Sequence, residues 1–239
     1  MSSNMSSNDL NTQDSSATEA NSAAQNAKQL FDLRRAYLKG GLDETNSNDC
    51  PIKQFSQWFE QAQAANLIEP NAMVLATVDK QGSPNTRTVL LKYFDEHGLV
   101  FFTNYASQKA AEMTAQPQVA LQFLWLDLER QVKIRGTATK IPLTESMRYF
   151  MSRPKGSQIG AWVSHQSQII SSKSLLLSQY EKLKQKFSQG DIPFPEFWGG
   201  YRVEPSAFEF WQGGEHRLHD RIEYLKDTQG NWQKQRRSP

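Results

Sequence analysis

The stretch Ala72-Met73-Val74-Leu75-Ala76-Thr77-Val78 leads into Asp79-Lys80-Gln81-Gly82-Ser83-Pro84, and a second apolar run extends from Thr86 to Tyr93. Branched and apolar residues favour strands, whereas a cluster of Asp, Gly, Ser and Pro favours a turn. This stretch therefore predicts a β-hairpin, and it marks the start of a β-rich region of the chain.

Further strand signals continue toward the C-terminus. Asp95-Glu96-His97-Gly98 predicts a turn before a strand over 99–103. A strand over 119–125 pairs naturally with one over 131–141 across a polar connection, and final strands are expected near 201–211 and 215–225. Such a succession of short strands predicts a small antiparallel barrel of about six strands.

Helical signals flank and interrupt these strands. Leu30, Leu33, Tyr37 and Leu38 recur at helical spacing before two glycines. A second helix is expected from Pro51, with an apolar stripe that indicates core packing: Phe55, Trp58, Phe59 and Ala62. Further helices are expected at about 107–114, 144–151, 158–164 and 172–187. The predicted class is α+β, an antiparallel barrel with peripheral helices.

The chain has 239 residues, a formal net charge of +2 and a single cysteine, Cys50. One good-sized core is expected. The small charge argues against nucleic acid or membrane partners, and one cysteine excludes an internal disulfide and favours a reducing cytoplasm. The four histidines and Cys50 show no metal-ligand spacing, so no metal site is expected. No G-x-G-x-x-G or P-loop sequence is present, so side chains with loop or helix-end amides would have to hold any phosphate.

The first 27 residues are rich in Ser, Asn, Ala and Gln and contain almost no large apolar side chain. Such a segment cannot offset the entropy of ordering, so 1–27 is predicted to be a disordered tail and 28–239 the folded domain. The tail holds Asp9, Asp14 and Glu19 and no arginine, which argues against a transit peptide.

The run Glu209-Phe210-Trp211-Gln212-Gly213-Gly214-Glu215-His216-Arg217-Leu218-His219-Asp220-Arg221 carries the strongest functional signal. In a hairpin, Arg217, His219 and Arg221 would share one strand face, because side chains alternate with period two. That row would suit an anionic aromatic small molecule. A solvated edge strand with ordinary charges is the alternative.

This run closely resembles the C-terminal signature of the pyridoxamine 5'-phosphate oxidases, flavin enzymes that make pyridoxal 5'-phosphate. Other segments resemble blocks of the same family in the same order, and together they extend from about Leu30 to the C-terminus. These segments are Leu33-Arg34-Arg35-Ala36-Tyr37, Arg87-Thr88-Val89-Leu90-Leu91-Lys92, Ser152-Arg153-Pro154, Ser157-Gln158-Ile159-Gly160-Ala161-Trp162 and Phe197-Trp198-Gly199-Gly200.

The resemblance implies a homodimeric split barrel that binds flavin mononucleotide (FMN) at the subunit interface, with a dimerisation and substrate region over about 197–239. It implies oxidation of pyridoxamine or pyridoxine 5'-phosphate by O2 to pyridoxal 5'-phosphate, with release of H2O2. Two alternatives remain: a split-barrel flavin or deazaflavin reductase, and a non-catalytic pyridoxal-phosphate binding protein.

The resemblance also assigns residues to the flavin. The expected contacts are Arg87, Thr88, Val89, Leu90, Leu91, Lys92, Phe102, Thr103, Gln108, Lys109, Gln131, Gln166, Ser167, Trp211 and Arg221. Gln108 departs from the family, in which arginine commonly stands at this position, so one charged partner of the flavin phosphate is missing. Arg87 and Lys92 lie five apart, so on one regular strand they would point to opposite faces and serve different groups.

The substrate contacts implied by the family are Arg34, Arg35, Tyr37, Lys92, Tyr149, Arg153, Ser157, Arg217, Leu218 and His219. Arg217 and His219 are the expected catalytic pair, with His219 able to accept or relay a proton near neutral pH. Tyr149 and Arg153 lie four apart, which would place them on one face of a helix, although Pro154 indicates that this helix ends immediately. Ala36 departs from the family, which commonly has an acidic residue there.

Overall fold

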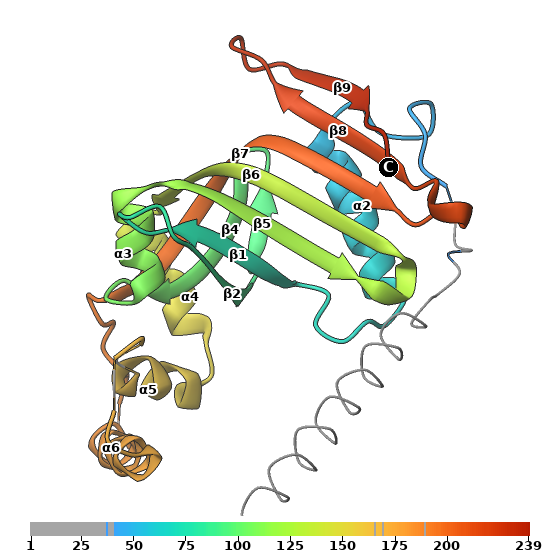
Figure 1. Cartoon of the computed structure of the whole chain (residues 1–239). Coiled ribbons are helices and arrows are strands. Elements are labelled where there is room, and N and C mark those ends of the chain that lie inside the picture. Colours follow the sequence, from blue (N-terminus) through green and yellow to red (C-terminus); the bar gives the residue numbers. More distant parts are fainter. Residues whose placement is uncertain (1–36, 38–40, 165, 169, 189) are drawn as a thin grey trace, which may run out of the picture. The chain divides into compact units, whose positions relative to one another are not determined.

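The structure, a computed structural model, describes residues 37 and 41–239 apart from residues 165, 169 and 189. The predicted tail, most of the first predicted helix, and Arg34 and Arg35 lie outside the described residues. From residue 41 onward the chain forms one sheet with helices around it, which confirms the α+β class (Figure 1). No helix in this described part is both long enough and apolar enough to cross a membrane.

The sheet has nine strands in the described residues, more than the six or so expected. They are β1 (Ala72–Val78), β2 (Pro84–Leu90), β3 (Tyr93–Asp95), β4 (Gly98–Asn104), β5 (Gln118–Trp125), β6 (Arg130–Lys140), β7 (Trp198–Gln212), β8 (Asp220–Lys226) and β9 (Trp232–Arg236). All the strand pairs are antiparallel, and the predicted β1–β2 and β5–β6 pairs are confirmed. Seven of these strands correspond to the strand segments named from the sequence, and the other two are the short β3 and β9.

The sheet forks along β7. One side of β7 pairs with β6 over 201–212, while the other side pairs with β4 over 198–203 and with β8 over 207–212. The strands β2-β1-β5-β6-β7-β4-β3 curl into the barrel, and β8 and β9 diverge from it (Figure 1). This fork makes the barrel a split one.

Two glycines allow the neighbouring strands to approach β7 closely at the fork. A β-carbon on Gly98 would lie 2.1 Å from the carbonyl oxygen of Val203, and one on Gly136 would lie 2.2 Å from that of Glu204. The β6–β7 register shifts between Arg135 and Gly136, at the same level. Glycine is required here because any side chain would meet backbone atoms.

The barrel closes where the chain bends between β2 and β3. The predicted strand over 86–93 is interrupted at Leu91 and Lys92, whose amides donate to Asn71 O (2.8 Å) and Val100 O (2.9 Å). The expectation that Arg87 and Lys92 occupy opposite faces of one strand is therefore wrong. The bend places Lys92 between two strands, so period-two alternation does not reach it.

The described helices are α2 (Pro51–Ala64), α3 (Gln108–Ala115), α4 (Leu143–Ser152), α5 (Lys155–Val163) and α6 (Lys173–Lys186). The stripe predicted on α2 packs on the barrel core, where the Phe55 ring lies 4.9 Å from that of Phe94 and 5.0 Å from that of Phe123. A second core joins α4 and α5 to β7 through Phe150, Ile159 and Trp198. This second core supports the elements that carry the site.

The connection from β7 to β8 differs from the predicted hairpin. A 3-10 turn over Glu215–Arg217 precedes β8, and Arg217 has φ of 65°. Arg217 and His219 therefore lie outside the strand that holds Arg221, and the expected row on one strand face is not formed. The turn curls back because the Gly214 amide donates to His219 Nδ1 (3.1 Å) and the Leu218 amide donates to Glu215 O (2.9 Å).

Candidate functional site

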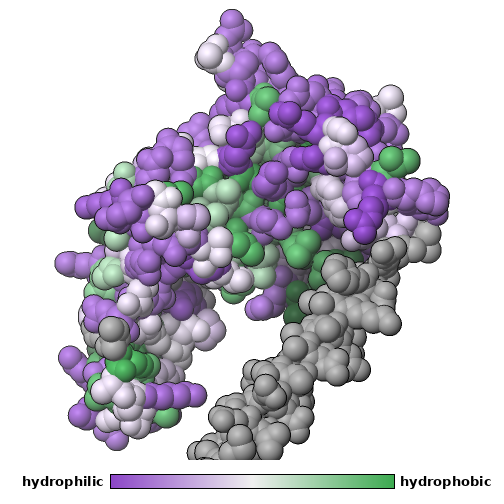
Figure 2. Space-filling model, viewed as in Figure 1, coloured by the Kyte–Doolittle hydropathy of each residue, from purple (hydrophilic) through white to green (hydrophobic). Residues whose placement is uncertain are grey.

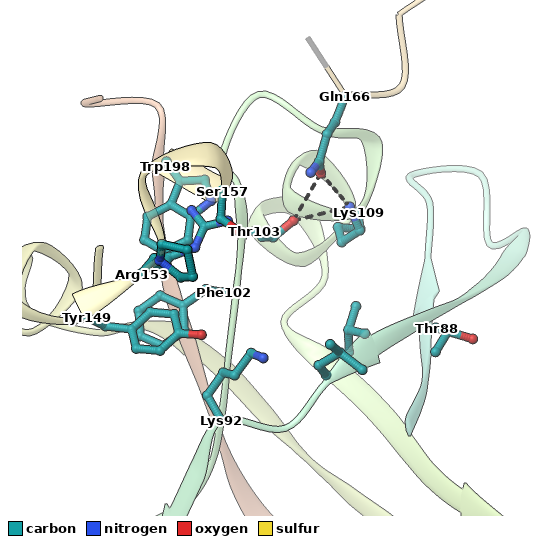
Figure 3. A pocket seen from close by; sticks show the side chains of 13 residues that line it. Thr88, Lys92, Phe102, Thr103, Lys109, Tyr149, Arg153, Ser157, Gln166 and Trp198 are labelled. Carbon is teal, nitrogen blue, oxygen red and sulfur yellow. Dashed lines mark hydrogen bonds between the residues drawn. The ribbon is translucent and has the colours of Figure 1, made fainter. Parts of the chain in front are cut away.

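A pocket of about 490 Å³ lies where the β2–β3 bend, β4, the start of α3 and the α4–α5 junction meet (Figure 3). It is lined by Thr88, Val89, Leu90, Lys92, Phe102, Thr103, Lys109, Tyr149, Arg153, Pro154, Ser157, Gln166 and Trp198. All but Pro154 and Trp198 belong to the sets predicted from the sequence. Its volume lies in the range of small-molecule and cofactor sites.

One end of the pocket is cationic because of Lys109. Its Nζ donates to Gln166 Oε1 (3.1 Å), Thr103 Oγ1 (3.2 Å) and Ser107 Oγ (3.3 Å), contacts that Figure 3 shows in part. Burial and, secondly, the charge of Arg87 lower the pKa of Lys109. A bound anion would offset the effects of burial and of Arg87 on the pKa of Lys109, because it would stabilise the ammonium form.

The opposite end has a charged donor on an aromatic wall. The rings of Tyr149 and Phe102 stack at 4.0 Å, those of Phe102 and Trp198 at 5.2 Å, and the Arg153 guanidinium lies 4.8 Å from the Trp198 ring. Figure 3 shows Arg153 and Tyr149 on one side of the pocket and Lys109 with Gln166 on the other. The pocket thus has two separate cationic ends.

Arg153 Nη1 is buried and has no hydrogen-bond partner among the described residues. Burial also lowers the pKa of Arg153. An unpaired buried donor of a charged group costs free energy that an anionic ligand would recover. The helix ends before Pro154, as expected, so Arg153 lies just beyond α4 with extended φ and ψ of −75° and 150° and does not share a helix face with Tyr149. Pro154 disfavours the helical conformation at the residue before it.

A second group of predicted flavin residues lies in a row on the outer face of the sheet. The strand register pairs Gln131 with Trp211 and Trp211 with Arg221, although these residues are far apart in the sequence. Arg221 is held by Glu209 Oε2 (2.8 Å) and Ser238 O (2.8 Å). This row, Gln131-Trp211-Arg221, is absent from the pocket lining within the described part of one chain.

The turn before β8 holds the predicted catalytic pair beside this row. The ring of His219 lies 4.7 Å from that of Trp211, and its Nδ1 accepts the Gly214 amide. A neutral His219 therefore carries its proton on Nε2. Leu218 is 71% exposed, and Leu218 and His219 line a separate cavity with the C-terminal residues 236–239.

The remaining predicted residues lie outside the pocket lining or outside the described residues. The Arg87 guanidinium pairs with Glu112 Oε2 (3.0 Å). The backbone amide of Gln108 donates to Ser167 Oγ (3.2 Å). Leu91 is 4% exposed, in the core. Of the predicted N-terminal contacts, only Tyr37 is described.

The sequence prediction missed two pocket residues, Pro154 and Trp198, and the buried Glu112. Trp198 could have been found, because it lies in the block Phe197-Trp198-Gly199-Gly200 that carried part of the resemblance. Nothing in the sequence indicated a role for Glu112, because an isolated glutamate on a helix is usually exposed to solvent.

Comparison with known families and sequences identifies relatives of this chain. Residues 59–187 match the family model of pyridoxamine 5'-phosphate oxidase, and residues 198–239 match that of the pyridoxine 5'-phosphate oxidase C-terminal dimerisation region. Pyridoxine/pyridoxamine 5'-phosphate oxidase 2 of Hydrogenovibrio crunogenus is 66% identical over 88% of this chain and 98% of its own. Pyridoxine/pyridoxamine 5'-phosphate oxidase of Crocosphaera subtropica is 60% identical over 82% and 91%.

Solved structures show the same fold. PhzG of Burkholderia lata, crystallised with tetrahydrophenazine-1-carboxylic acid, superposes with a TM-score of 0.79 at 26% identity, over 84% of this chain and 99% of its own. A pyridoxamine 5'-phosphate oxidase-related, FMN-binding protein of Nostoc punctiforme gives 0.67 at 17% identity, over 80% and 98%. The family models and the curated relatives show that this chain belongs to the pyridoxamine 5'-phosphate oxidase family.

Proposed function

We propose that the protein is an FMN-dependent oxidase that converts pyridoxamine or pyridoxine 5'-phosphate to pyridoxal 5'-phosphate in vitamin B6 metabolism, with O2 as acceptor and H2O2 as by-product. The observation that carries the proposal is a pocket with two separate cationic ends, one of them the Arg153 guanidinium, whose buried Nη1 has no hydrogen-bond partner among the described residues. Two phosphate-bearing molecules, cofactor and substrate, need two such ends. With Cys50 as the sole cysteine, we place this activity in the cytoplasm.

The Lys109 end fits the phosphate of FMN. Lys109, Thr103 and Gln166 already converge there, and the adjacent start of α3 adds backbone amides. The strand segment 88–90 forms the neighbouring wall along which the cofactor would extend. Bound FMN supplies the electron chemistry, taking two electrons from the substrate and passing them to O2.

The Arg153 end fits the substrate phosphate. Arg153 presents its unpaired donor, and Lys92, Tyr149 and Ser157 supply an ammonium and two hydroxyls within the same pocket. Anchoring the phosphate there would fix the pyridine ring between the two ends, so that the C4' carbon is held against the cofactor. The stacked aromatic wall would exclude water from that side.

A second subunit would complete the site. The predicted flavin contacts of the row Gln131-Trp211-Arg221 lie outside the pocket of their own chain, as do Arg217 and His219. Exposed apolar residues share the face of this row: Leu124, paired with Gln131, is 53% exposed, and Val74 is 38% exposed. Figure 2 shows apolar side chains gathered over this sheet face within a mostly hydrophilic surface. The match of 198–239 to a dimerisation region supports a homodimer built through this face.

Within such a dimer, Arg217 and His219 would approach the substrate ring from the partner subunit. Since Nδ1 of His219 is occupied by the Gly214 amide, Nε2 is the atom through which His219 would donate or hold a proton. Arg217 would supply a positive charge beside the ring. These roles of His219 Nε2 and of the Arg217 charge add detail to the catalytic pair expected from the sequence.

The test is a visible spectrum of the purified protein before and after anaerobic addition of pyridoxine 5'-phosphate. We expect a yellow flavin band that bleaches and returns when air is admitted. A flavin band that persists with substrate would refute the oxidase. A colourless protein that FMN does not reconstitute would favour a pyridoxal-phosphate binding protein instead.

A further inference from the structure

A buried carboxylate lies beneath the Lys109 end of the pocket. Glu112, on α3, is only 4% exposed, and it accepts hydrogen bonds from Thr77 Oγ1 (2.5 Å), Asn85 Nδ2 (2.8 Å) and Arg87 Nη2 (3.0 Å). These donors come from β1 and β2. Glu112 thus ties the helix that carries Lys109 to the strand that forms the pocket wall.

Glu112 is ionised in this setting. Burial opposes its ionisation, but hydrogen bonds from Thr77, Gln108 and Arg87 outweigh burial and lower the pKa of Glu112. A buried carboxylate is tolerated only when donors satisfy it, and here both of its oxygens are engaged. The pair with Arg87 is therefore a charged one.

The pair lies within electrostatic reach of the cationic end of the pocket. The charge of Arg87 lowers the pKa of Lys109, and that of Glu112 raises it. Arg87 also immediately precedes Thr88, the first residue of the pocket wall. Its Nη2 donates to Glu112 and its Nη1 donates to the hydroxyl of Thr77, which in turn donates to Glu112.

We propose that Glu112 is a positioning residue that fixes Arg87 beside the phosphate of bound FMN, and that Gln108 serves the same carboxylate. The inference rests on the proposed function, in which the Lys109 end holds that phosphate. Gln108, one turn before Glu112 on α3, then completes the shell of donors around the carboxylate. Glutamine at position 108, where the family commonly has arginine, would then have a role that needs no direct contact between Gln108 and the phosphate.

Two effects of removing the carboxylate have opposite signs. Loss of a negative charge near the phosphate would by itself strengthen FMN binding. Loss of the partner that orients Arg87 would weaken it, because a charge-assisted hydrogen bond depends on geometry. We expect the loss of orientation to dominate.

The experiment compares FMN with riboflavin, which lacks the phosphate, as ligands of the full-length apoprotein. Flavin fluorescence titrations would be made on the wild type, Glu112→Gln and the matched control Glu204→Gln, which breaks an exposed pair with Lys226 (3.3 Å). We expect Glu112→Gln to weaken FMN about tenfold and to change riboflavin affinity by less than about twofold. The control should leave both affinities unchanged.

Three results would overturn the proposal: tighter FMN binding by Glu112→Gln, equal losses for both ligands, or no change. If Glu112→Gln does not fold, Thr77→Val supplies the test, because it keeps the charge and removes the hydroxyl that joins Glu112 to Arg87. It should show a smaller loss confined to FMN, and a loss shared with riboflavin would refute the idea. A wild type that does not bind FMN would instead overturn the proposed function itself.

Discussion

At the scale of single residues, the proposed function assigns Arg153 to the substrate end of the pocket. Its guanidinium is held over Trp198, yet its Nη1 has no partner among the described residues. We therefore expect Arg153→Ala to lower kcat/KM for pyridoxine 5'-phosphate about ten- to hundredfold, the loss of one or two charged hydrogen bonds. The loss should fall mainly on KM, and FMN content should not change.

The matched control for this prediction is Arg148→Ala, which removes an exposed arginine from α4. Steady-state kinetics and flavin absorbance on both variants make the measurement. Loss of flavin from Arg153→Ala, or equal kinetic effects of the two substitutions, would contradict the assignment of Arg153 to the substrate phosphate.

The next prediction concerns the nitrogen of His219 that carries the imidazole proton. The Gly214 amide donates to Nδ1, which leaves Nε2 as the atom that can donate toward the substrate. In His219→Gln the amide nitrogen can take the place of Nε2, whereas in His219→Asn the side chain reaches only the position of Nδ1. We expect the glutamine variant to retain the higher kcat, measured with pyridoxine 5'-phosphate. The reverse order would show that Nδ1 matters more.

At the scale of elements, the approach of β6 to β7 depends on Gly136. A β-carbon there would meet the carbonyl oxygen of Glu204 at 2.2 Å, so one of the two strands must move. Gly136→Ala should lower the free energy of unfolding by about 1–3 kcal/mol or more. Gly160→Ala is the control, because nothing lies within 4 Å of its β-carbon and α5 gains a better helix former. Urea unfolding of both variants tests the difference, and equal stabilities would contradict it.

The elements also show where sequence patterns succeed. The hairpin over 72–90 and the stripe on α2 arise from local chemistry, and both were predicted. The row of Arg217, His219 and Arg221 was not formed, because period-two reasoning assumes a strand. Here a hydrogen bond from Gly214 to His219 bends the chain before the strand begins. A contact between a backbone amide and a side chain five residues on leaves no trace in a hydrophobic pattern.

At the scale of the whole molecule, tertiary register assembles what the sequence separates. Gln131, Trp211 and Arg221 could be grouped from the sequence only by resemblance, whereas strand pairing makes them direct neighbours. Glu112 could not be found at all, because its role depends on donors from two strands. The lining of the pocket was therefore largely predictable, and the resemblance implied a site at the subunit interface. The sequence did not show which predicted residues line the pocket and which lie in the separate row of the same chain.

That division leads to a prediction for the dimer. If each site combines the pocket of one subunit with the turn of the other, Arg153→Ala and Arg217→Ala damage different contributors to the same site. In a mixed dimer, one site then carries both defects, while the other pairs an intact pocket with an intact turn. With substrate well below KM, where both parents are nearly inactive, random assortment should restore about a quarter of wild-type activity.

The measurement is the activity of the two variants after joint refolding or coexpression with different affinity tags. Mixing two preparations of the same variant is the control and should restore nothing. If pocket and turn served the same site within one chain, every site of the mixed dimer would keep one defect. Activity of the mixture no higher than the average of its parents would therefore place Arg217 in the subunit that holds Arg153, and would overturn the shared site.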